Sequence, residues 1–239
     1  MTRCGIVAIV GAPNAGKSTL LNRLVGERLA IVSARPQSTR LPVIAVRTTD
    51  DTQAILVDTP GILEPGYALH RAMTAALAEA LDDADVVLHL VDGGEPYDAG
   101  TIPSLQELVR TPELHKKVLT VVNKSDRGDA PGSPADAVHI AARSGDGIED
   151  LWLAIRARLP EGEFRHDPDD LSTQSTRFFV CEILRETAFE LLQDELPYAL
   201  HCDVEEFREN KDPMYIRVTL YVERESQKGI VVGKGGRQL

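Results

Sequence analysis

Residues 11–18 read GAPNAGKS and stand between an apolar run, Ile6 to Val10, and a segment with helical spacing that begins at Lys17. In this context the pattern GxxxxGK[ST] is typical of a strand, a phosphate-binding loop and a helix. Its glycines let backbone N–H groups wrap the β-phosphate of a nucleotide, and the helix start adds the positive end of its dipole. We therefore predict a nucleotide site that uses Gly11, Ala12, Pro13, Asn14, Ala15, Gly16, Lys17, Ser18 and Thr19.

The phosphate end of such a site needs cationic charge and groups that hold a metal ion. Lys17 is expected to bridge the β- and γ-phosphates, and Ser18 to hold Mg²⁺. Asp58-Thr-Pro-Gly61 follows an apolar run, so Asp58 falls at the carboxyl end of a strand, where an aspartate reaches Mg²⁺ through water. Asp129-Ala-Pro-Gly132 repeats the DxxG spacing in a turn-rich segment and is interpreted as a loop.

The third group expected at the magnesium ion is a hydroxyl from the loop between the first helix and the second strand. Ser38-Thr39-Arg40 lies between the first helix and the second strand, where a loop can lay a hydroxyl on Mg²⁺ and a backbone N–H on the γ-phosphate. We predict Thr39 for this role and keep Ser38 as the alternative. The predicted catalytic set is Lys17, Thr39, Asp58 and Gly61.

Asn123-Lys124-Ser125-Asp126 follows the apolar run Val118 to Val122 and selects the base. A carboxylate such as that of Asp126 accepts both the N1–H and the 2-amino hydrogen of guanine, whereas adenine has neither donor on that edge. A site built for those hydrogen bonds rejects a base that lacks them, because its carboxylate would be left unpaired. Guanine nucleotides are therefore predicted, with Asn123 tying this loop to the phosphate loop and the Lys124 stem covering one face of the base.

Two units are expected along the chain. Up to about residue 158, short β-branched runs alternate with helical segments, which is typical of an α/β domain with a mostly parallel sheet. We assign 1–160 to this GTP-binding domain, 161–173, a polar segment with Pro, Gly and acidic residues, to a linker, and 174–239 to a smaller α+β domain. The predicted strands are 6–10, 43–47, 53–57, 86–91 and 118–122, then 200–207 and 215–222 in the second unit. The predicted helices are 17–26, 69–81, 102–110, 147–159 and 174–194.

Composition restricts the class of protein. The 239 residues suffice for one α/β domain and a smaller partner. The three cysteines are scattered without a CxxC pair, which fits buried thiols in a reducing compartment and argues against a zinc site. A secretory leader and an apolar run of ~20 residues are both missing, so a cytoplasmic protein is expected. The net charge of −11 argues against broad electrostatic binding of nucleic acid, and only residues 213–239 are basic, at +3.

The order of these motifs resembles the Era family of translation-factor-like GTPases. GAPNAGKS, QSTR, DTPG and NKSD are followed by AARSGDG at 141–147. The second unit carries RFFVCEI at 177–183, DELPYAL at 194–200 and YVERESQKGIVVGKGG at 221–236. The resemblance covers nearly the whole chain. It implies a P-loop GTPase that uses GTP/GDP and Mg²⁺, a partial KH domain over 174–239, and a fifth guanine-contacting motif at Ala141, Ala142 and Arg143.

The resemblance also implies partners and a location. Era-like proteins bind the 3′ end of small-subunit (16S) rRNA and act in assembly of the small ribosomal subunit, with peripheral contact at the inner face of the cell membrane. We expect a monomer. The sequence shows no amphipathic membrane helix that would support the membrane contact.

Three departures from the family pattern affect these expectations. The fifth motif usually reads Ser-Ala, and Ala141-Ala142 lacks the hydroxyl but keeps the backbone N–H that faces guanine O6, so weaker guanine binding is expected. Only 14 residues separate Asp126 from Ala141, about half of the family's interval, so a peripheral helix is expected to be missing. The chain ends three residues after Gly236, before the last helix and strand of such a KH domain, so single-stranded rRNA should bind weakly and with a strong salt dependence.

Hydrolysis is expected to be slow. Ras-like enzymes orient the attacking water with a Gln directly after DxxG, but here that position is Ile62, whose side chain cannot hydrogen-bond. In relatives with a hydrophobic residue there, a monovalent cation contributes charge, and some hold it with an asparagine at the position of Asn14. We hypothesise that Asn14 ligates K⁺. The alternative, which we weigh equally, is that Asn14 is only a turn residue whose side chain bonds to the backbone.

The predicted RNA-binding loop is formed by Gly233, Lys234, Gly235 and Gly236. A KH domain presses a GxxG turn against four nucleotides of single-stranded RNA, and side chains there would block the approach. By propensity the preceding stretch, Gln227 to Val232, would be a strand, whereas the resemblance makes it a helix, which we adopt. A glycine-rich frayed end is the alternative for the loop.

Other function classes share part of these features. A P-loop kinase that uses the tail as a substrate domain conflicts with NKSD. A binding module with a vestigial nucleotide site conflicts with intact Lys17, Ser18 and Asp58. The tRNA-modification and double-G-domain GTPases share the nucleotide motifs but lack YVERESQK before GxxG, and they remain the alternative among RNA-associated GTPases.

Overall fold

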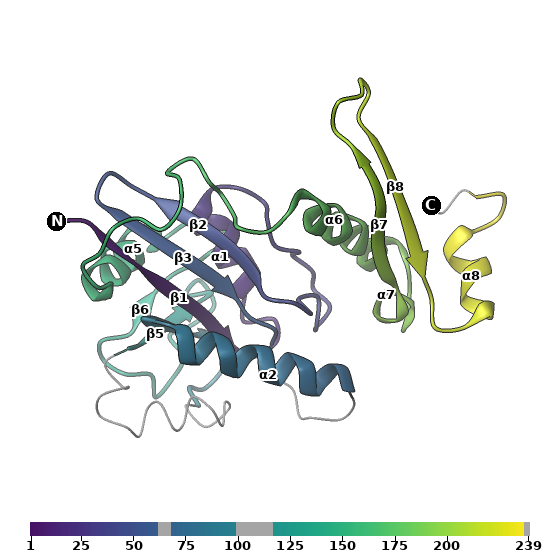
Figure 1. Cartoon of the computed structure of the whole chain (residues 1–239). Coiled ribbons are helices and arrows are strands. Elements are labelled where there is room, and N and C mark those ends of the chain that lie inside the picture. Colours follow the sequence, from purple (N-terminus) through teal and green to yellow (C-terminus); the bar gives the residue numbers. More distant parts are fainter. Residues whose placement is uncertain (62–67, 99–116, 237–239) are drawn as a thin grey trace. The chain divides into compact units, whose positions relative to one another are not determined.

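The computed structural model describes residues 1–61, 68–98 and 117–236 (Figure 1). The chain divides into two compact units. Unit 1 comprises Met1–Ala30 and Thr39–Thr173, and unit 2 comprises Ile31–Ser38 and Gln174–Leu239.

In unit 1 the described strands form one sheet of six with the order β2-β3-β1-β4-β5-β6, drawn in Figure 1. The edge pair β2 and β3 is antiparallel, and the other neighbours run parallel. The register places Asp58 beside Ile9 and Asn123 beside Asp92, so the carboxyl ends of the central strands meet at one edge of the sheet. The strands are β1 Arg3–Gly11, β2 Val43–Thr48, β3 Thr52–Asp58, β4 Val86–Asp92, β5 Val118–Asn123 and β6 Val138–His139.

Helices cover both faces of the central strand β1. Ala8 and Val10 pack with Leu77 and Leu81 of α2 (Ala68–Asp83). Val7, Ile9 and their neighbours alternate with these residues and are also fully buried, on the opposite face. There α1 (Lys17–Val25) packs against β1, β2 and β3 and contacts α5 (Ile148–Arg158). Burial on both faces explains why β1 is a continuous apolar run rather than an alternating one.

The predicted fold class, an α/β domain with a mostly parallel sheet followed by a smaller α+β domain, is confirmed, and the predicted strands of unit 1 agree with the observed ones to within a few residues. The two-residue strand β6 was not predicted. Between Asp126 and Ala141 the described backbone forms turns and β6 without a helix, as the short interval indicated. The predicted helix 102–110 lies outside the described residues.

Residues 161–173, predicted as a linker, lie along unit 1. The side chain of Gln53 in β3 is fully buried and accepts hydrogen bonds from the backbone N–H groups of Arg165 (2.8 Å) and His166 (3.0 Å). The N–H of Val46 in β2 donates to the carbonyl of Leu171 at 2.9 Å. A polar segment can follow the sheet in this way because a buried glutamine satisfies its backbone, which composition does not reveal.

The described residues of unit 2 form a two-stranded antiparallel sheet and three helices, whose arrangement Figure 1 shows. Its apolar core joins the end of the first helix to the last helix through Ala188, Leu192, Leu196, Leu200 and Val231. The elements are α6 Thr176–Leu191, α7 Leu196–Ala199, β7 His201–Arg208, β8 Tyr215–Tyr221 and α8 Glu225–Val232.

The helix expected from the family resemblance at residues 227–232 is confirmed, and the strand favoured by propensity is wrong. Gln227 and Val231 are buried and lie four residues apart, whereas Ile230 is 55% exposed. The side-chain oxygen of Gln227 accepts the N–H of Arg224 at 3.0 Å and so closes the first turn. Packing of one helical face and this cap outweigh the strand preference of the β-branched residues.

Candidate functional site

The phosphate loop joins the end of β1 to the start of α1, so the first N–H groups of α1 face the loop. The predicted residues Gly11 to Thr19 form one continuous loop and first helical turn. Gly16 has a φ of +99°, and a Cβ there would lie 2.3 Å from Nδ2 of Asn123. Only glycine therefore fits between the loop and that asparagine.

Lys17 places a buried cation inside the loop. Its ammonium donates to the carbonyl oxygens of Gly11 (3.1 Å) and Ala12 (3.0 Å), and the residue is only 6% exposed. Burial lowers the pKa of Lys17, and the negative charge of Asp58 opposes this shift. A positive charge beside backbone N–H groups is the arrangement that binds the β- and γ-phosphates of a nucleotide.

Three predicted magnesium ligands lie together at the end of the loop. Ser18 Oγ is 2.6 Å from Asp58 Oδ2 and 3.2 Å from Thr39 Oγ1, and Thr39 Oγ1 donates to the same carboxylate oxygen at 3.3 Å. The three come from α1, the segment before β2, and the end of β3. Two hydroxyls and a carboxylate are hard oxygen ligands of the kind that Mg²⁺ accepts, so this cluster could hold the ion.

Three further residues predicted around the phosphate site, Ser38, Gly61 and Ile62, differ in where the structure places them. Ser38, the alternative to Thr39, belongs to unit 2, where its carbonyl accepts a hydrogen bond from Arg185 at 2.8 Å. Gly61 lies against the phosphate loop, since a Cβ on it would be 3.2 Å from Cα of Pro13. Ile62 lies outside the described residues.

Asn123 ties the base-binding loops to the phosphate loop, as predicted. Its Nδ2 donates to the carbonyl of Ala15 at 2.8 Å, and its Oδ1 accepts the N–H of Ala142 at 2.9 Å. The side chain is 3% exposed. One amide group thus fixes the distance between the phosphate loop and the loop that carries Ala141, Ala142 and Arg143.

Lys124 and Asp126 have different surroundings. The Lys124 ammonium donates to the carbonyl of Asn14 at 2.8 Å and pairs with Asp92 at 2.5 Å, so its stem is held beside the loop. Burial raises the pKa of Asp92, but the hydrogen bond and charge of Lys124 reverse the shift and leave it lowered. Asp126 is exposed and can receive a base. Asp92 was not predicted, because an acidic residue after a strand is a common feature of turns.

Arg23, at the last turn of α1, is a further residue of this site that sequence reasoning missed. Its Nε donates to the carbonyl of Ala142 at 3.0 Å, and its Nη2 donates to the carbonyl of Arg143. The guanidinium carbon lies 3.8 Å from where a Cβ of Gly145 would be. Arg23 therefore fixes the backbone of the fifth motif through hydrogen bonds that come from α1. Basic residues are common in the last turn of a helix because they interact favourably with the helix dipole. The presence of an arginine at this position therefore does not predict the contact with the fifth motif.

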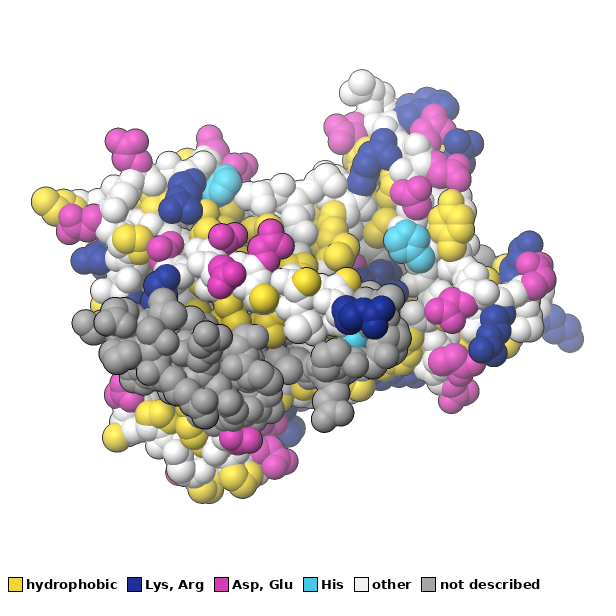
Figure 2. Space-filling model, turned by 60° about the horizontal axis from the view of Figure 1, so that its bottom comes forward, with side chains coloured by type: hydrophobic (Ala, Val, Ile, Leu, Met, Phe, Trp, Pro, Cys, Tyr) yellow, Lys and Arg dark blue, Asp and Glu magenta, His cyan; other side chains and the backbone are white. Residues whose placement is uncertain are grey.

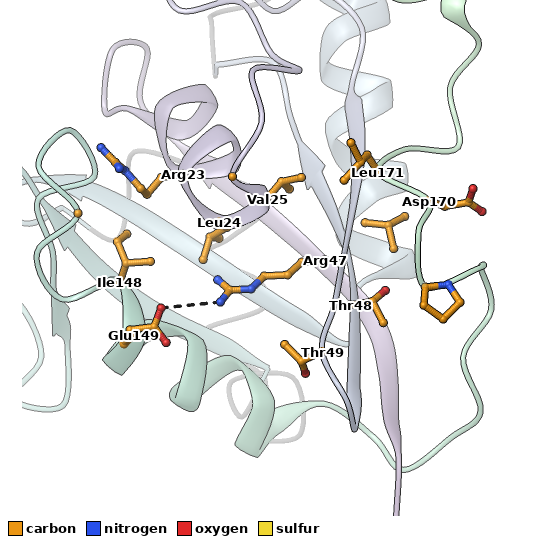
Figure 3. Close-up of a pocket in the computed structure, with 14 residues that line it drawn as sticks. Arg23, Leu24, Val25, Arg47, Thr48, Thr49, Ile148, Glu149, Asp170 and Leu171 are labelled. Carbon is orange, nitrogen blue, oxygen red and sulfur yellow. Dashed lines mark ion pairs between the residues drawn. The ribbon is translucent and has the colours of Figure 1, made fainter.

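A hollow of about 540 Å³ lies next to Arg23 (Figure 3). Arg47 points into it, pairs with Glu149 at 3.8 Å and stacks at 4.1 Å on the ring of Trp152. Arg23 and Gly145 line it together, whereas none of the predicted phosphate or magnesium residues does. The hollow thus lies beside Arg23 and Gly145 and is separate from the phosphate loop.

The predicted RNA loop follows α8 directly. Gly233, Gly235 and Gly236 all have φ values near +70°, and a Cβ on Gly235 or Gly236 would meet nothing within 4 Å. The loop is therefore an open turn whose backbone a ligand can approach. On the face shown in Figure 2, basic and acidic side chains are interspersed over the coloured residues rather than gathered into one basic field.

Two family models match the chain. The model described as 50S ribosome-binding GTPase matches residues 6–124, and the model described as KH domain matches residues 195–239. The GTPase Era of Caulobacter vibrioides is 38% identical over 264 residues, which cover 100% of this chain and 83% of that protein.

Two solved structures are similar over the whole chain. A variant of Aquifex aeolicus Era bound to GDP and aluminium fluoride has a TM-score of 0.85 and 32% identity, and the match covers 99% of this chain and 85% of that one. A structure of Era with MgGDPNP and nucleotides 1506–1542 of 16S ribosomal RNA has a TM-score of 0.85 and 31% identity, with 100% and 85% covered.

Replacing Asp126 by Asn should reverse the base preference. The amide can donate to the 2-oxygen of xanthine but cannot accept both guanine hydrogens, so affinity for GTP should fall about 100-fold or more while affinity for XTP rises. Titration with both nucleotides measures this. Asp129→Asn, in the exposed DxxG turn, is the matched control and should keep the preference for GTP. Unchanged GTP affinity in Asp126→Asn would contradict the assignment.

Replacing Arg23 by Ala should weaken GDP binding by about tenfold, because two charge-assisted hydrogen bonds to the guanine loop are lost from a partly exposed site. Titration with fluorescent GDP gives the affinity. Arg158→Ala is the control, since Arg158 donates to Ala154 within its own helix. Equal GDP affinity in Arg23→Ala and the wild type would remove the assigned role.

Proposed function

The chain belongs to the Era family of GTPases, and we propose that it binds the 3′ end of small-subunit rRNA through unit 2 and acts in assembly of the small ribosomal subunit under control of its GTP cycle. The GTPase activity follows from the family. The RNA target is the one held by the similar Era structure, which contains nucleotides 1506–1542 of 16S ribosomal RNA.

The observation that carries the nucleotide chemistry is the cluster of Ser18, Thr39 and Asp58 beside Lys17. Each hydroxyl lies within 3.3 Å of the same carboxylate oxygen of Asp58. We assign Ser18 and Thr39 as direct ligands of Mg²⁺ and Asp58 as the residue that holds it through water. When bound, the ion would neutralise charge that develops on the phosphates.

Lys17, Thr39 and Asn123 have separate roles in binding the nucleotide. Lys17, which is itself buried, binds the β- and γ-phosphates together with the backbone N–H groups of the loop. Thr39 responds to the γ-phosphate, because its hydroxyl and N–H belong to a segment that can be released when that phosphate leaves. Asn123 keeps the base and phosphate loops at a constant distance, so that Asp126 meets guanine while Lys17 meets the phosphates.

Potassium is the proposed extra cation. Asn14 is exposed, has a φ of +63°, and offers its carbonyl to Lys124, so its backbone already acts in a turn while its side chain faces outward. We assign that side chain as a K⁺ ligand near the phosphates, where a monovalent cation would stabilise transition-state charge.

GTP hydrolysis at equal ionic strength should therefore be about fivefold or more faster in K⁺ than in Na⁺. Asn14→Ala should remove the difference and leave the rate in Na⁺ unchanged. Asn210→Ala, at an exposed turn of unit 2, should keep the difference. Phosphate release in the two salts measures both, and rates that agree within error in the wild type would rule out the cation.

The proposed RNA site is the turn Gly233 to Gly236 after α8. Gly235 and Gly236 are exposed and have open space where a side chain would stand, and residues 213–239 carry a net charge of +3. A backbone turn without side chains can approach the phosphates of single-stranded RNA closely. The KH family model spans this turn.

Aspartate at Gly235 and Gly236 should weaken binding of an RNA with the 16S 3′-end sequence by about tenfold, because two negative side chains would project where phosphates bind. GTP binding should be unchanged. Gly132→Asp is the matched control, since Gly132 has a positive φ and no atom within 4 Å of its Cβ position. Fluorescence anisotropy with labelled RNA measures the affinity, and equal RNA affinity in all three proteins would place recognition elsewhere.

The peripheral membrane contact is carried over from the family resemblance, and the monomeric state is our own expectation. We propose a cytoplasmic monomer that contacts the inner face of the cell membrane peripherally. Among the helices in the described part of the chain, none combines the length and apolarity needed to span a bilayer.

A further inference from the structure

Two cysteines from different elements of unit 2 are in direct contact. Cys181 lies on α6 and Cys202 on β7, and their sulfur atoms are 2.7 Å apart. The thiol of Cys202 donates to the sulfur of Cys181, and the thiol of Cys181 donates to the carbonyl of Cys202 at 3.3 Å. The two cysteines are 21 positions apart in the sequence, so no local motif predicts their contact.

The two thiols differ in access to solvent. Cys202 is 7% exposed, and burial, followed by the hydrogen bond with Cys181, raises the pKa of its thiol to about 12. Cys181 is half-buried and is therefore the thiol that a small solute reaches first. Cys4, the third cysteine, is buried in unit 1 with its sulfur 3.7 Å from Gln53 Oε1, so it belongs to a separate environment.

A metal site does not account for the pair. Within the described residues, no three His, Cys, Asp or Glu side chains gather where they could hold a metal ion. Two sulfurs alone fall short of the four ligands of a structural zinc site. Two thiols in contact can instead form a disulfide when an oxidant is present.

We propose that Cys181 and Cys202 are a reversible modification site that hydrogen peroxide converts to an intramolecular disulfide. The thiolate of Cys181 attacks one peroxide oxygen, the O–O bond breaks, and hydroxide leaves and takes a proton to become water. The sulfur of Cys202 then displaces the sulfenic hydroxyl of Cys181 as a second water. Two thiols thereby lose two electrons and two protons, and one hydrogen peroxide is reduced to two waters.

The contact favours the second step. A sulfenic acid at Cys181 would have the Cys202 thiol beside it before any solute thiol arrives, which gives the intramolecular reaction a high effective concentration. The product joins α6 to β7 and closes the loop between residues 181 and 202, so it should stabilise unit 2 against unfolding. The nucleotide loop lies in unit 1, and its residues take no part in the reaction.

Mass spectrometry of the full chain treated with hydrogen peroxide tests the proposal. We expect a species that has lost two hydrogens, and in the tryptic digest a link between peptides 178–185 and 186–208 that dithiothreitol reverses. The unfolding midpoint of unit 2, followed by hydrogen exchange of α6, should rise by about 5 °C or more. GTP hydrolysis should be unchanged.

Three variants separate the outcomes. Cys181→Ser and Cys202→Ser should each abolish the link and the rise in the midpoint, whereas Cys4→Ser should keep both. Peptides that carry Cys181 and Cys202 as separate sulfinic acids, or a link between two copies of the chain, would overturn the proposal. A link that leaves the midpoint unchanged would overturn the stabilising role.

Discussion

The amide of Asn123 is the contact on which the nucleotide site depends. Through one planar group it donates to Ala15 in the phosphate loop and accepts from Ala142 in the fifth motif, and it packs against Gly16 so closely that a Cβ would not fit. Both loops are irregular backbone and could otherwise move separately. Because the amide is buried, losing one of its hydrogen bonds would cost about 1–3 kcal/mol, and this penalty keeps the two loops at a fixed separation.

The parallel sheet explains why these loops meet at all. In parallel pairs every strand ends at the same edge, so the residues after β1, β3, β4 and β5 are neighbours although they are far apart in sequence. Asp58 and Asn123 occupy the last positions of β3 and β5. The short turns between Asp126 and β6 show that a peripheral helix can be absent without moving Ala142 away from Asn123, since β6 still pairs with β5.

Sequence reasoning succeeded where a local motif has a fixed structural context. The phosphate loop, Asp58 and Asn123 each follow an apolar run, so the strand that positions them could be predicted with them. Arg23 could not be found in this way, because its partners are 119 and 120 positions away and its type already suits a helix end. The helical state of residues 227–232 likewise depends on Val231 packing in a core that a local propensity does not contain.

Charge distribution limits how unit 2 could hold RNA in the complex we propose. On its two strands Arg217 pairs with Glu205 at 3.0 Å and Arg208 pairs with Glu206, so this sheet adds little net positive potential. With −11 on the whole chain, the long-range attraction of RNA is weak, and cationic contacts are restricted to the basic residues of 213–239. Short-range contacts must then dominate, and backbone N–H groups in an open glycine turn are effective only when the RNA backbone fits their spacing. In the complex we propose, the acidic balance would weaken nonspecific binding, and the shape of the glycine turn would set how closely the RNA backbone approaches.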